Sequence, residues 1–219
     1  MVPARRVDRG PTDNSLWFAE ATQVQDELDR FGPAGSVLEL ACGTGLWTRR
    51  LVAHAQEITA VDLSPETLDI NRRSVDDPRV TYVQADIFSW TPPRTYDVCV
   101  FTFWLSHVPE AHFDAFWQAV ARSLRTGGRV FFVDSGPTDQ GSLTRRPAAR
   151  DETMTRRLAD GRAFTIVKRR LEPTALQERL TALGWEAQVQ STDRYFIWGH
   201  ARRSEPGVAR SSPLPCSPS

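Results

Sequence analysis

The stretch Ser36–Gly45 constrains the fold of this chain more than any other part of the sequence. It reads Ser-Val-Leu-Glu-Leu-Ala-Cys-Gly-Thr-Gly, an apolar strand pattern that runs into a tight glycine turn and is followed by a helical pattern. Gly43 and Gly45 allow backbone N–H groups to approach a ligand that a side chain would crowd. A second strand pattern ends at Asp62, whose carboxylate suits the two hydroxyls of a ribose. The two strands together predict an α/β unit that binds a nucleoside.

Two nucleoside cofactors use such a layout, and the spacing of the glycines separates them. Dinucleotide-binding folds favour Gly-x-Gly-x-x-Gly, in which the third glycine permits close packing of the helix on the strand. That third position is Thr48 here, so the fit to NAD is poor. The run Glu39–Gly45 instead resembles motif I of the class I S-adenosylmethionine-dependent methyltransferases. An ordinary turn between strand and helix is the alternative reading of a Gly-x-Gly pair on its own.

Further motifs follow in the order that this family shows. They are strand patterns that lie over Val80–Phe88, Tyr96–Thr102 and Leu124–Val133, the last of which includes a helix end and a double-glycine turn. The first of these patterns ends in an acid, Asp86, followed by an apolar residue, Ile87. The resemblance implies that Asp86 accepts from an adenine amino group and that Ile87 covers the ring. It extends over Ser36–Asp134 and more loosely to Arg202.

The alternation of strand and helix patterns predicts an α/β fold with a parallel sheet. The family implies a doubly wound, seven-stranded, mostly parallel sheet with an antiparallel last strand. We expect a flexible N-terminus over residues 1–13, one methyltransferase domain over 14–203, and a disordered tail over 204–219. The other expected elements are a helix from Asn14 or Ser15 to Phe31, a helix after Pro109, a helix over Asp151–Leu158, a strand over Arg162–Lys168, a helix from Pro173 to Gly184, and terminal strands over Glu186–Gln190 and Arg194–His200.

The segment 143–170 lies between the fifth strand and the next helix, where methyltransferases of this type often place a substrate lid. It is too long for a simple connection, and it holds nine Arg or Lys residues against three acids. Arginine forks recognise carboxylates and phosphates, so Arg145 and Arg146 are predicted to meet an acidic acceptor. A solvated helix face is the alternative reading of the same charges.

The predicted site lies outside the carboxyl ends of the parallel strands, at the topological switch point. The residues predicted to contact the cofactor are Trp17, Glu39, Ala41, Gly43, Gly45, Asp62, Leu63, Asp86, Ile87, Phe101 and Thr102. Phe103 and Trp104 are predicted to wall the acceptor pocket. His107, just past the fourth strand, is the predicted general base, because histidine titrates near neutrality. A histidine that only braces the loop is the alternative.

Bulk properties exclude several function classes. The chain carries 27 basic and 27 acidic residues, and its net charge of zero argues against coating nucleic acid or an anionic membrane. The three cysteines show no metal-ligand spacing, and no acid cluster suits a divalent ion, so no metal is expected. The sequence shows neither a membrane span nor a signal-peptide pattern, so we expect a reduced, cytoplasmic protein.

These features predict an enzyme that transfers a methyl group from S-adenosyl-L-methionine to a small molecule, with the oxygen of a hydroxyl, phenol or carboxyl as the first choice. N-methylation is a close alternative that the motifs do not separate. An RNA or protein methyltransferase that uses the basic lid, and a fold that binds the cofactor without catalysis, are further alternatives. We expect a monomer or homodimer.

Overall fold

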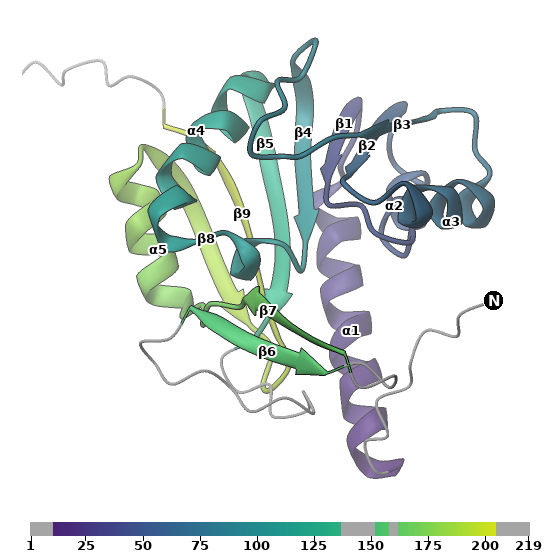
Figure 1. The fold of residues 1–219 in the computed structure, drawn as a ribbon. Helices are drawn as coiled ribbons and strands as arrows, with labels where there is room; N and C mark the ends of the chain where they lie inside the picture. The colour runs from purple at the N-terminus through teal and green to yellow at the C-terminus, as the bar shows by residue number, and fades with distance from the viewer. Residues whose placement is uncertain (1–10, 137–151, 158–161, 205–219) are drawn as a thin grey trace, which may run out of the picture.

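The computed structural model describes residues 11–136, 152–157 and 162–204, in which seven strands form one sheet in the order β3-β2-β1-β4-β5-β9-β8 (Figure 1). These strands are β1 (Ser36–Leu40), β2 (Glu57–Asp62), β3 (Val80–Gln84), β4 (Tyr96–Thr102), β5 (Leu124–Ser135), β8 (Trp185–Ser191) and β9 (Phe196–Arg203). Strands β1 to β5 pair in parallel, whereas β9 is antiparallel to β5 and to β8. The predicted sheet and its antiparallel last strand are confirmed. That strand lies between β5 and β8, so the reversed strand is not at the edge of the sheet.

Helices cover both faces of the sheet (Figure 1). The helices α1 (Pro11–Phe31), α2 (Thr48–Leu51) and α3 (Pro65–Val75) lie on one face, and α4 (Phe113–Ser123) and α5 (Pro173–Ala182) lie on the other. Successive residues of a strand point to opposite faces. Leu38 therefore belongs to the core cluster of α4 and α5, whereas Val37 belongs to that of α1 to α3. The apolar stripe of α4, with Phe116 and Trp117, is buried as its helical spacing predicts.

Two short strands outside the sheet form an antiparallel hairpin, β6 (Thr153–Arg157) with β7 (Ala163–Val167). The prediction of a helix over Asp151–Leu158 is therefore wrong. Met154 is buried between two exposed threonines, which is the two-residue period of a strand. In Figure 1 the hairpin lies beyond the arrowheads of β4 and β5, at the carboxyl edge of the sheet.

Several element boundaries differ from expectation. Helix α1 begins at Pro11, before the expected cap at Asn14 or Ser15. Strand β5 already begins at Leu124, where we expected a helix end, and its pairing with β4 shifts register between Tyr96 and Val98. The disordered segments expected over 1–13 and 204–219 lie almost wholly outside the described residues. No helix in the described part of the chain is long and apolar enough to cross a membrane.

Candidate cofactor and acceptor site

The carboxyl ends of the parallel strands meet at one edge of the sheet, and β1 and β4 lie side by side at its centre. The chain leaves β1 toward β2 on one side and leaves β4 toward β5 on the other. Such a reversal of direction opens a crevice in which doubly wound folds bind their ligands. The structure therefore brings the predicted residues that follow β1, β2, β3 and β4 to the same edge.

The glycine loop, which we define as residues 41–47, follows β1. Three of its residues have a positive φ: Ala41 at 53°, Gly43 at 55° and Gly45 at 95°. A Cβ atom on Gly43 would meet nothing within 4 Å, so this backbone borders open space, as approach to a ligand requires. A Cβ atom on Gly45 would instead lie 2.5 Å from Oδ1 of Asn71. Gly45 is therefore required by packing against α3, which the sequence did not indicate.

Asp62 ends β2 beside the glycine loop. Its Oδ2 accepts a hydrogen bond from the Gly43 N–H at 3.0 Å, and its Oδ1 accepts one from the Ser64 N–H at 3.0 Å. The side chain is half-buried. A carboxylate has about four lone-pair positions, so both oxygens can still accept from the two hydroxyls of a ribose. The two backbone bonds hold the carboxylate in place before any ligand arrives.

Replacing Asp62 by alanine is expected to weaken binding of S-adenosylhomocysteine at least about tenfold, because a charged acceptor contributes roughly 1.5–3 kcal/mol. Titration calorimetry measures the affinity, and circular dichroism checks that the chain stays folded. Asp69→Ala is the matched control, since Asp69 forms only an exposed ion pair with Arg72 within α3. Equal affinity of the Asp62 variant and the wild type would remove the ribose assignment.

Glu39 lies inside β1, and its side chain is only 1% exposed. The Thr48 hydroxyl donates to Oε2 at 2.6 Å, while Oε1 is buried without a hydrogen-bond partner among the described residues. Burial raises the pKa of Glu39 to about 8; the bond from Thr48 opposes this rise and the nearby Asp62 adds to it. A carboxyl in such a place holds its proton near neutral pH unless a cation approaches it.

The buried Glu39 makes the stability of the chain depend on pH in a defined direction. The folded chain keeps this proton up to about pH 8, whereas the unfolded chain releases it above 4.5. The stability contribution of Glu39 is therefore full below pH 4.5 and is lost as pH rises to about 8. Glu39→Gln lacks this loss, so its stability relative to the wild type is expected to grow with pH, by up to about 1.4 kcal/mol per unit. Urea unfolding across this range measures the difference, and parallel pH curves would contradict it.

An aromatic group lies where β4 ends. Phe103 has a positive φ of 53° and is 36% exposed, and its ring lies 6.0 Å from that of Phe196. Trp17 of α1 contacts Phe196 from another side at 5.5 Å. A phenylalanine in this backbone conformation is strained, and such strain concentrates at functional sites. Trp104 is the other residue predicted to line the acceptor pocket, and its ring lies 5.5 Å from the ring of Phe88.

His107 ends a short helical turn, Leu105–His107, after β4. Its Nδ1 lies 2.6 Å from the carbonyl oxygen of Val167 in the β6–β7 hairpin. A carbonyl oxygen only accepts, so Nδ1 carries the ring proton and Nε2 carries the lone pair of the neutral imidazole. The contact both braces the loop, as the alternative reading expected, and sets the tautomer that a general base needs.

A buried polar group joins the hairpin to the ends of β4 and β5. Asp134 is fully buried and accepts from the Ser106 N–H at 2.8 Å and from the Ser106 hydroxyl at 2.7 Å. Lys168 follows β7, and its Nζ donates to Ser106 Oγ at 2.7 Å and to Ser135 Oγ at 3.1 Å, and lies 3.3 Å from Asp134 Oδ1. The Arg169 N–H donates to the Ser106 carbonyl at 2.7 Å. These bonds fix the hairpin over the carboxyl edge beside His107.

The other predicted site residues differ in what they can reach. The side chain of Phe101 is fully buried among core aromatics such as Phe132, and a contact between Phe101 and the cofactor stays a prediction. Thr102 is almost fully buried, whereas Leu63 is 64% exposed. Asp86 is exposed and accepts from the Phe88 N–H at 3.0 Å. Arg145 and Arg146 lie outside the described residues.

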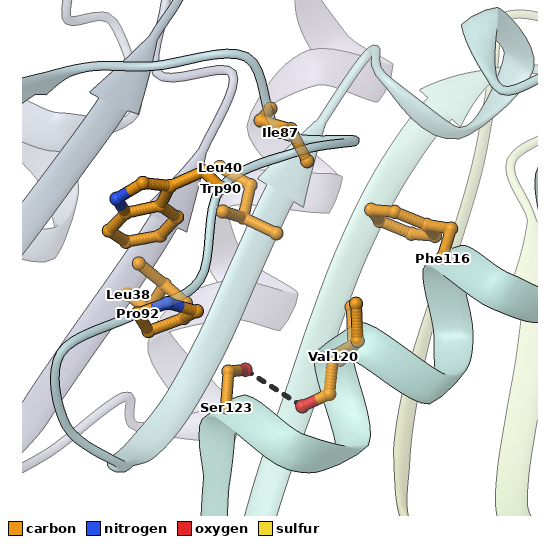
Figure 2. Close-up of a pocket in the computed structure, with 9 residues that line it drawn as sticks. Leu38, Leu40, Ile87, Trp90, Pro92, Phe116, Val120 and Ser123 are labelled. Atoms are coloured by element: carbon orange, nitrogen blue, oxygen red, sulfur yellow. Dashed lines mark hydrogen bonds between the residues drawn. The ribbon is translucent and has the colours of Figure 1, made fainter.

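Ile87 lines an apolar groove on the α4 face of the sheet (Figure 2). The groove is lined by Leu38, Leu40, Ile87, Trp90, Pro92, Phe116, Ala119, Val120 and Ser123. The Ser123 hydroxyl donates to the Val120 carbonyl at 2.7 Å, so the one hydroxyl in this lining is already bonded. Ile87 can therefore contribute apolar packing to a ligand in this groove.

The structure also shows residues that sequence reasoning missed. They are Asn71, Ser106, Asp134, Lys168 and Phe196. A signal existed for some of them: Asp134 lies near the end of the fifth strand as Asp62 lies at the end of the second, and Lys168 is the only lysine of the chain. Asn71 lies three residues after Leu68 and is a polar residue on the buried side of α3. No group of His, Cys, Asp and Glu side chains in the described ranges could hold a metal ion.

Comparison with known proteins identifies the family. A family model described as a methyltransferase domain matches residues 37–128. Two solved structures, a DhpI–SAH complex and a DhpI–SAM–HEP complex, are 38% and 39% identical to this chain. They cover 86% and 85% of this chain, the matches span 86% and 87% of their own chains, and both TM-scores are 0.75.

Curated relatives match over shorter parts of their own length. Trans-aconitate 2-methyltransferase of Streptomyces avermitilis is 33% identical over 183 residues, which are 80% of this chain and 65% of that enzyme. Across eight such relatives, the aligned stretch covers 40% to 65% of the relative, so this chain spans less than two thirds of their length.

The family follows from the sheet order, the glycine loop and the extent of these matches. The DhpI complexes are identical to this chain at more than a third of the aligned positions, and the alignments extend over most of both lengths. Both are complexes with SAM or SAH. The chain belongs to the class I S-adenosylmethionine-dependent methyltransferases.

Proposed function

We propose that this chain methylates an oxygen atom of a small molecule, with His107 as the general base. The observation that carries the proposal is the bond between His107 Nδ1 and the Val167 carbonyl oxygen at 2.6 Å. It leaves the basic lone pair on Nε2, at the end of β4 where the acceptor of a doubly wound fold enters. A hydroxyl acceptor gains most from such a base, because it must lose its proton during transfer.

The residues at the edge of the sheet fit the family's cofactor. S-adenosylmethionine, when bound, supplies a methyl group that is already activated by its sulfonium. The open space at Gly43 admits a ligand to the backbone, and Asp62 has lone pairs left for the ribose. Asp86 and Ile87 follow β3, and we propose that they hold the adenine. Phe101 is not part of this proposal, because its side chain lies in the core.

The chain's own contribution to the reaction is alignment and exclusion of water. We propose that Phe103, Phe196 and Trp17 form one wall of the acceptor pocket and that the β6–β7 hairpin closes it. For a hydroxyl acceptor, Nε2 of His107 would take the hydroxyl proton. A carboxylate acceptor carries no such proton, so His107 would then serve mainly to position it.

The size of the acceptor is inferred from the hairpin and from the relatives. Lys168, directly after the hairpin, is bonded to Ser106, Asp134 and Ser135, and a hairpin held in this way at the edge of the sheet favours a small acceptor over a macromolecule. The names trans-aconitate 2-methyltransferase and DhpI–SAM–HEP point to small acceptors in those proteins. Arg145 and Arg146 stay predicted contacts of an anionic acceptor. Arg169 pairs with Glu110 and Lys168 with Asp134, so these two cations are engaged within the protein.

The test is methyl transfer to a panel of small acceptors, followed by mass spectrometry. The panel contains hydroxy acids, phenols, carboxylic acids and amines, each with S-adenosylmethionine and with His107→Asn as a control enzyme. The expected product is a methyl ether or ester that forms with equal release of S-adenosylhomocysteine. Products on amines alone would favour N-methylation, and cofactor binding without any product would favour a binding protein.

A further inference from the structure

We propose that helix α3 positions the glycine loop for cofactor binding, and that Asn71 is the main positioning residue. The inference rests on the proposed location of the cofactor at that loop. Asn71 lies in the second half of α3, away from the strand ends, and its side chain is fully buried. A fully buried side chain cannot itself contact a ligand, so its effect on the cofactor passes through the loop.

Two side chains of α3 hold two consecutive carbonyl groups of the loop. Nδ2 of Asn71 donates to the Gly43 carbonyl at 3.1 Å, and the hydroxyl of Ser74 donates to the Thr44 carbonyl at 3.2 Å. Residues three apart lie on the same side of a helix, so α3 presents both donors together. Ser74 Oγ also lies 3.1 Å from the Asn71 carbonyl oxygen, so the two carbonyls share the one hydrogen of this hydroxyl, and the amide of Asn71 is the stronger hold on the loop.

Peptide geometry converts these two bonds into an orientation of the loop's N–H groups. A trans peptide is planar, and its C=O and N–H groups point in opposite directions. Holding the Gly43 and Thr44 carbonyls toward α3 therefore turns the N–H groups of Thr44 and Gly45 away from it. Gly45 N–H makes a long bond of 3.4 Å to the Cys42 carbonyl, and Thr44 N–H makes no hydrogen bond to any residue that the structure describes. An exposed N–H beside open space is a donor for a carboxylate or hydroxyl of a ligand.

A chain of hydrogen bonds fixes the orientation of the Asn71 amide. The hydroxyl of Tyr82 in β3 donates to Asn71 Oδ1 at 3.0 Å, so the oxygen of the amide faces β3. Nδ2 then faces the loop, where its second hydrogen is donated to Thr48 Oγ1 at 2.9 Å. Thr48 in turn donates to Glu39 at 2.6 Å. The chain links β3, α3, α2 and β1 behind the loop, and every donor in it points toward Glu39.

Packing at Gly45 completes the arrangement. A Cβ atom there would lie 2.5 Å from Asn71 Oδ1 and 3.0 Å from Ser74 Oγ, so the loop can lie this close to α3 only with a glycine. The missing side chain at Gly45 therefore allows the close approach in which Asn71 bonds to the Gly43 carbonyl. One face of α3 thus holds the loop by hydrogen bonds to its carbonyls, and the glycine makes room for this contact.

The experiment compares S-adenosylhomocysteine affinity in Asn71→Ala and Asn71→Asp by titration calorimetry, well below the melting temperature of each variant. We expect binding to weaken at least about tenfold in Asn71→Ala, which corresponds to about 1.4 kcal/mol. Asn71→Asp keeps the shape of the side chain, and its carboxylate cannot donate to Gly43. A similar loss in Asn71→Asp therefore assigns the effect to the donated bonds and not to packing.

Two further variants separate positioning from general destabilisation and from a misplaced site. Leu180→Ala removes a buried side chain of α5 on the opposite face, and it is expected to lower the melting temperature while S-adenosylhomocysteine affinity stays at the wild-type value. If Asp62→Ala weakens binding and Asn71→Ala does not, the positioning role is wrong and the cofactor site stands. If neither variant weakens binding, the cofactor site itself is misplaced. With an acceptor identified, positioning predicts a raised KM for S-adenosylmethionine and an unchanged kcat.

Discussion

His107→Asn is expected to lower kcat by about 10²–10⁴, the usual contribution of a general base. The amide of an asparagine reaches about as far as Nδ1 of histidine, so this variant can still donate to the Val167 carbonyl and brace the loop. It has no basic atom at the position of Nε2. The acceptor would have to lose its proton to water, from which the closed hairpin shields it. The measurement is the steady-state rate with an acceptor found in the panel.

The same variant decides between the two readings of this histidine. If His107 only braces the loop, His107→Asn keeps most of its activity, whereas His107→Ala loses both the brace and the rate. His54→Asn is a matched control, because His54 pairs with Asp29 between α1 and the segment after α2. Affinity for S-adenosylhomocysteine is expected to stay unchanged in all three variants. Normal turnover in His107→Asn would reject the proposed base.

Gly45→Val is expected to abolish cofactor binding and also to lower the stability of the fold. Its Cβ would lie 2.5 Å from Asn71 Oδ1 and 2.8 Å from Asn71 Cγ, and its φ of 95° is strained for any residue with a side chain. Overpacking costs about 1–3 kcal/mol, and backbone strain adds about 1–3 kcal/mol. The expected loss of stability follows from the packing of Gly45 against Asn71.

Gly43→Ala provides the comparison within the same loop. Gly43 also has a positive φ, but a Cβ there meets open space, so strain of about 1–2 kcal/mol is the only expected effect on stability. Thermal unfolding of both variants should therefore show the larger loss for Gly45→Val. Calorimetry with S-adenosylhomocysteine then reports on the open side of Gly43. A Gly45→Val chain that melts with the wild type would mean that α3 does not hold the loop so closely.

Local patterns in the sequence predicted most of the sheet. The short apolar runs around Val37 and Val98 are typical of buried strands. Pro173 begins a helix and Gly184 follows its end. These signals depend on neighbouring residues only, and they predicted the strands of the parallel core. The antiparallel last strand was implied by the resemblance to the family. The segment around Met154 was misread as helix, because a run of five residues holds too few turns to separate the two periods. Its strand pairs with β7, and the sequence of neither segment alone shows which strand it pairs with.

For the candidate site, the sequence by itself determined which residues follow the strand ends. The glycine loop, Asp62, Asp86 and His107 could all be named, since turn chemistry and strand ends are local features. Only the tertiary structure decided what surrounds them. His107 bonds to Val167, which is 60 positions away, and Asn71 bonds to Gly43, which is 28 positions away. Such contacts form because segments that are distant in the sequence come together in the folded chain, and no periodicity or spacing within either segment predicts them.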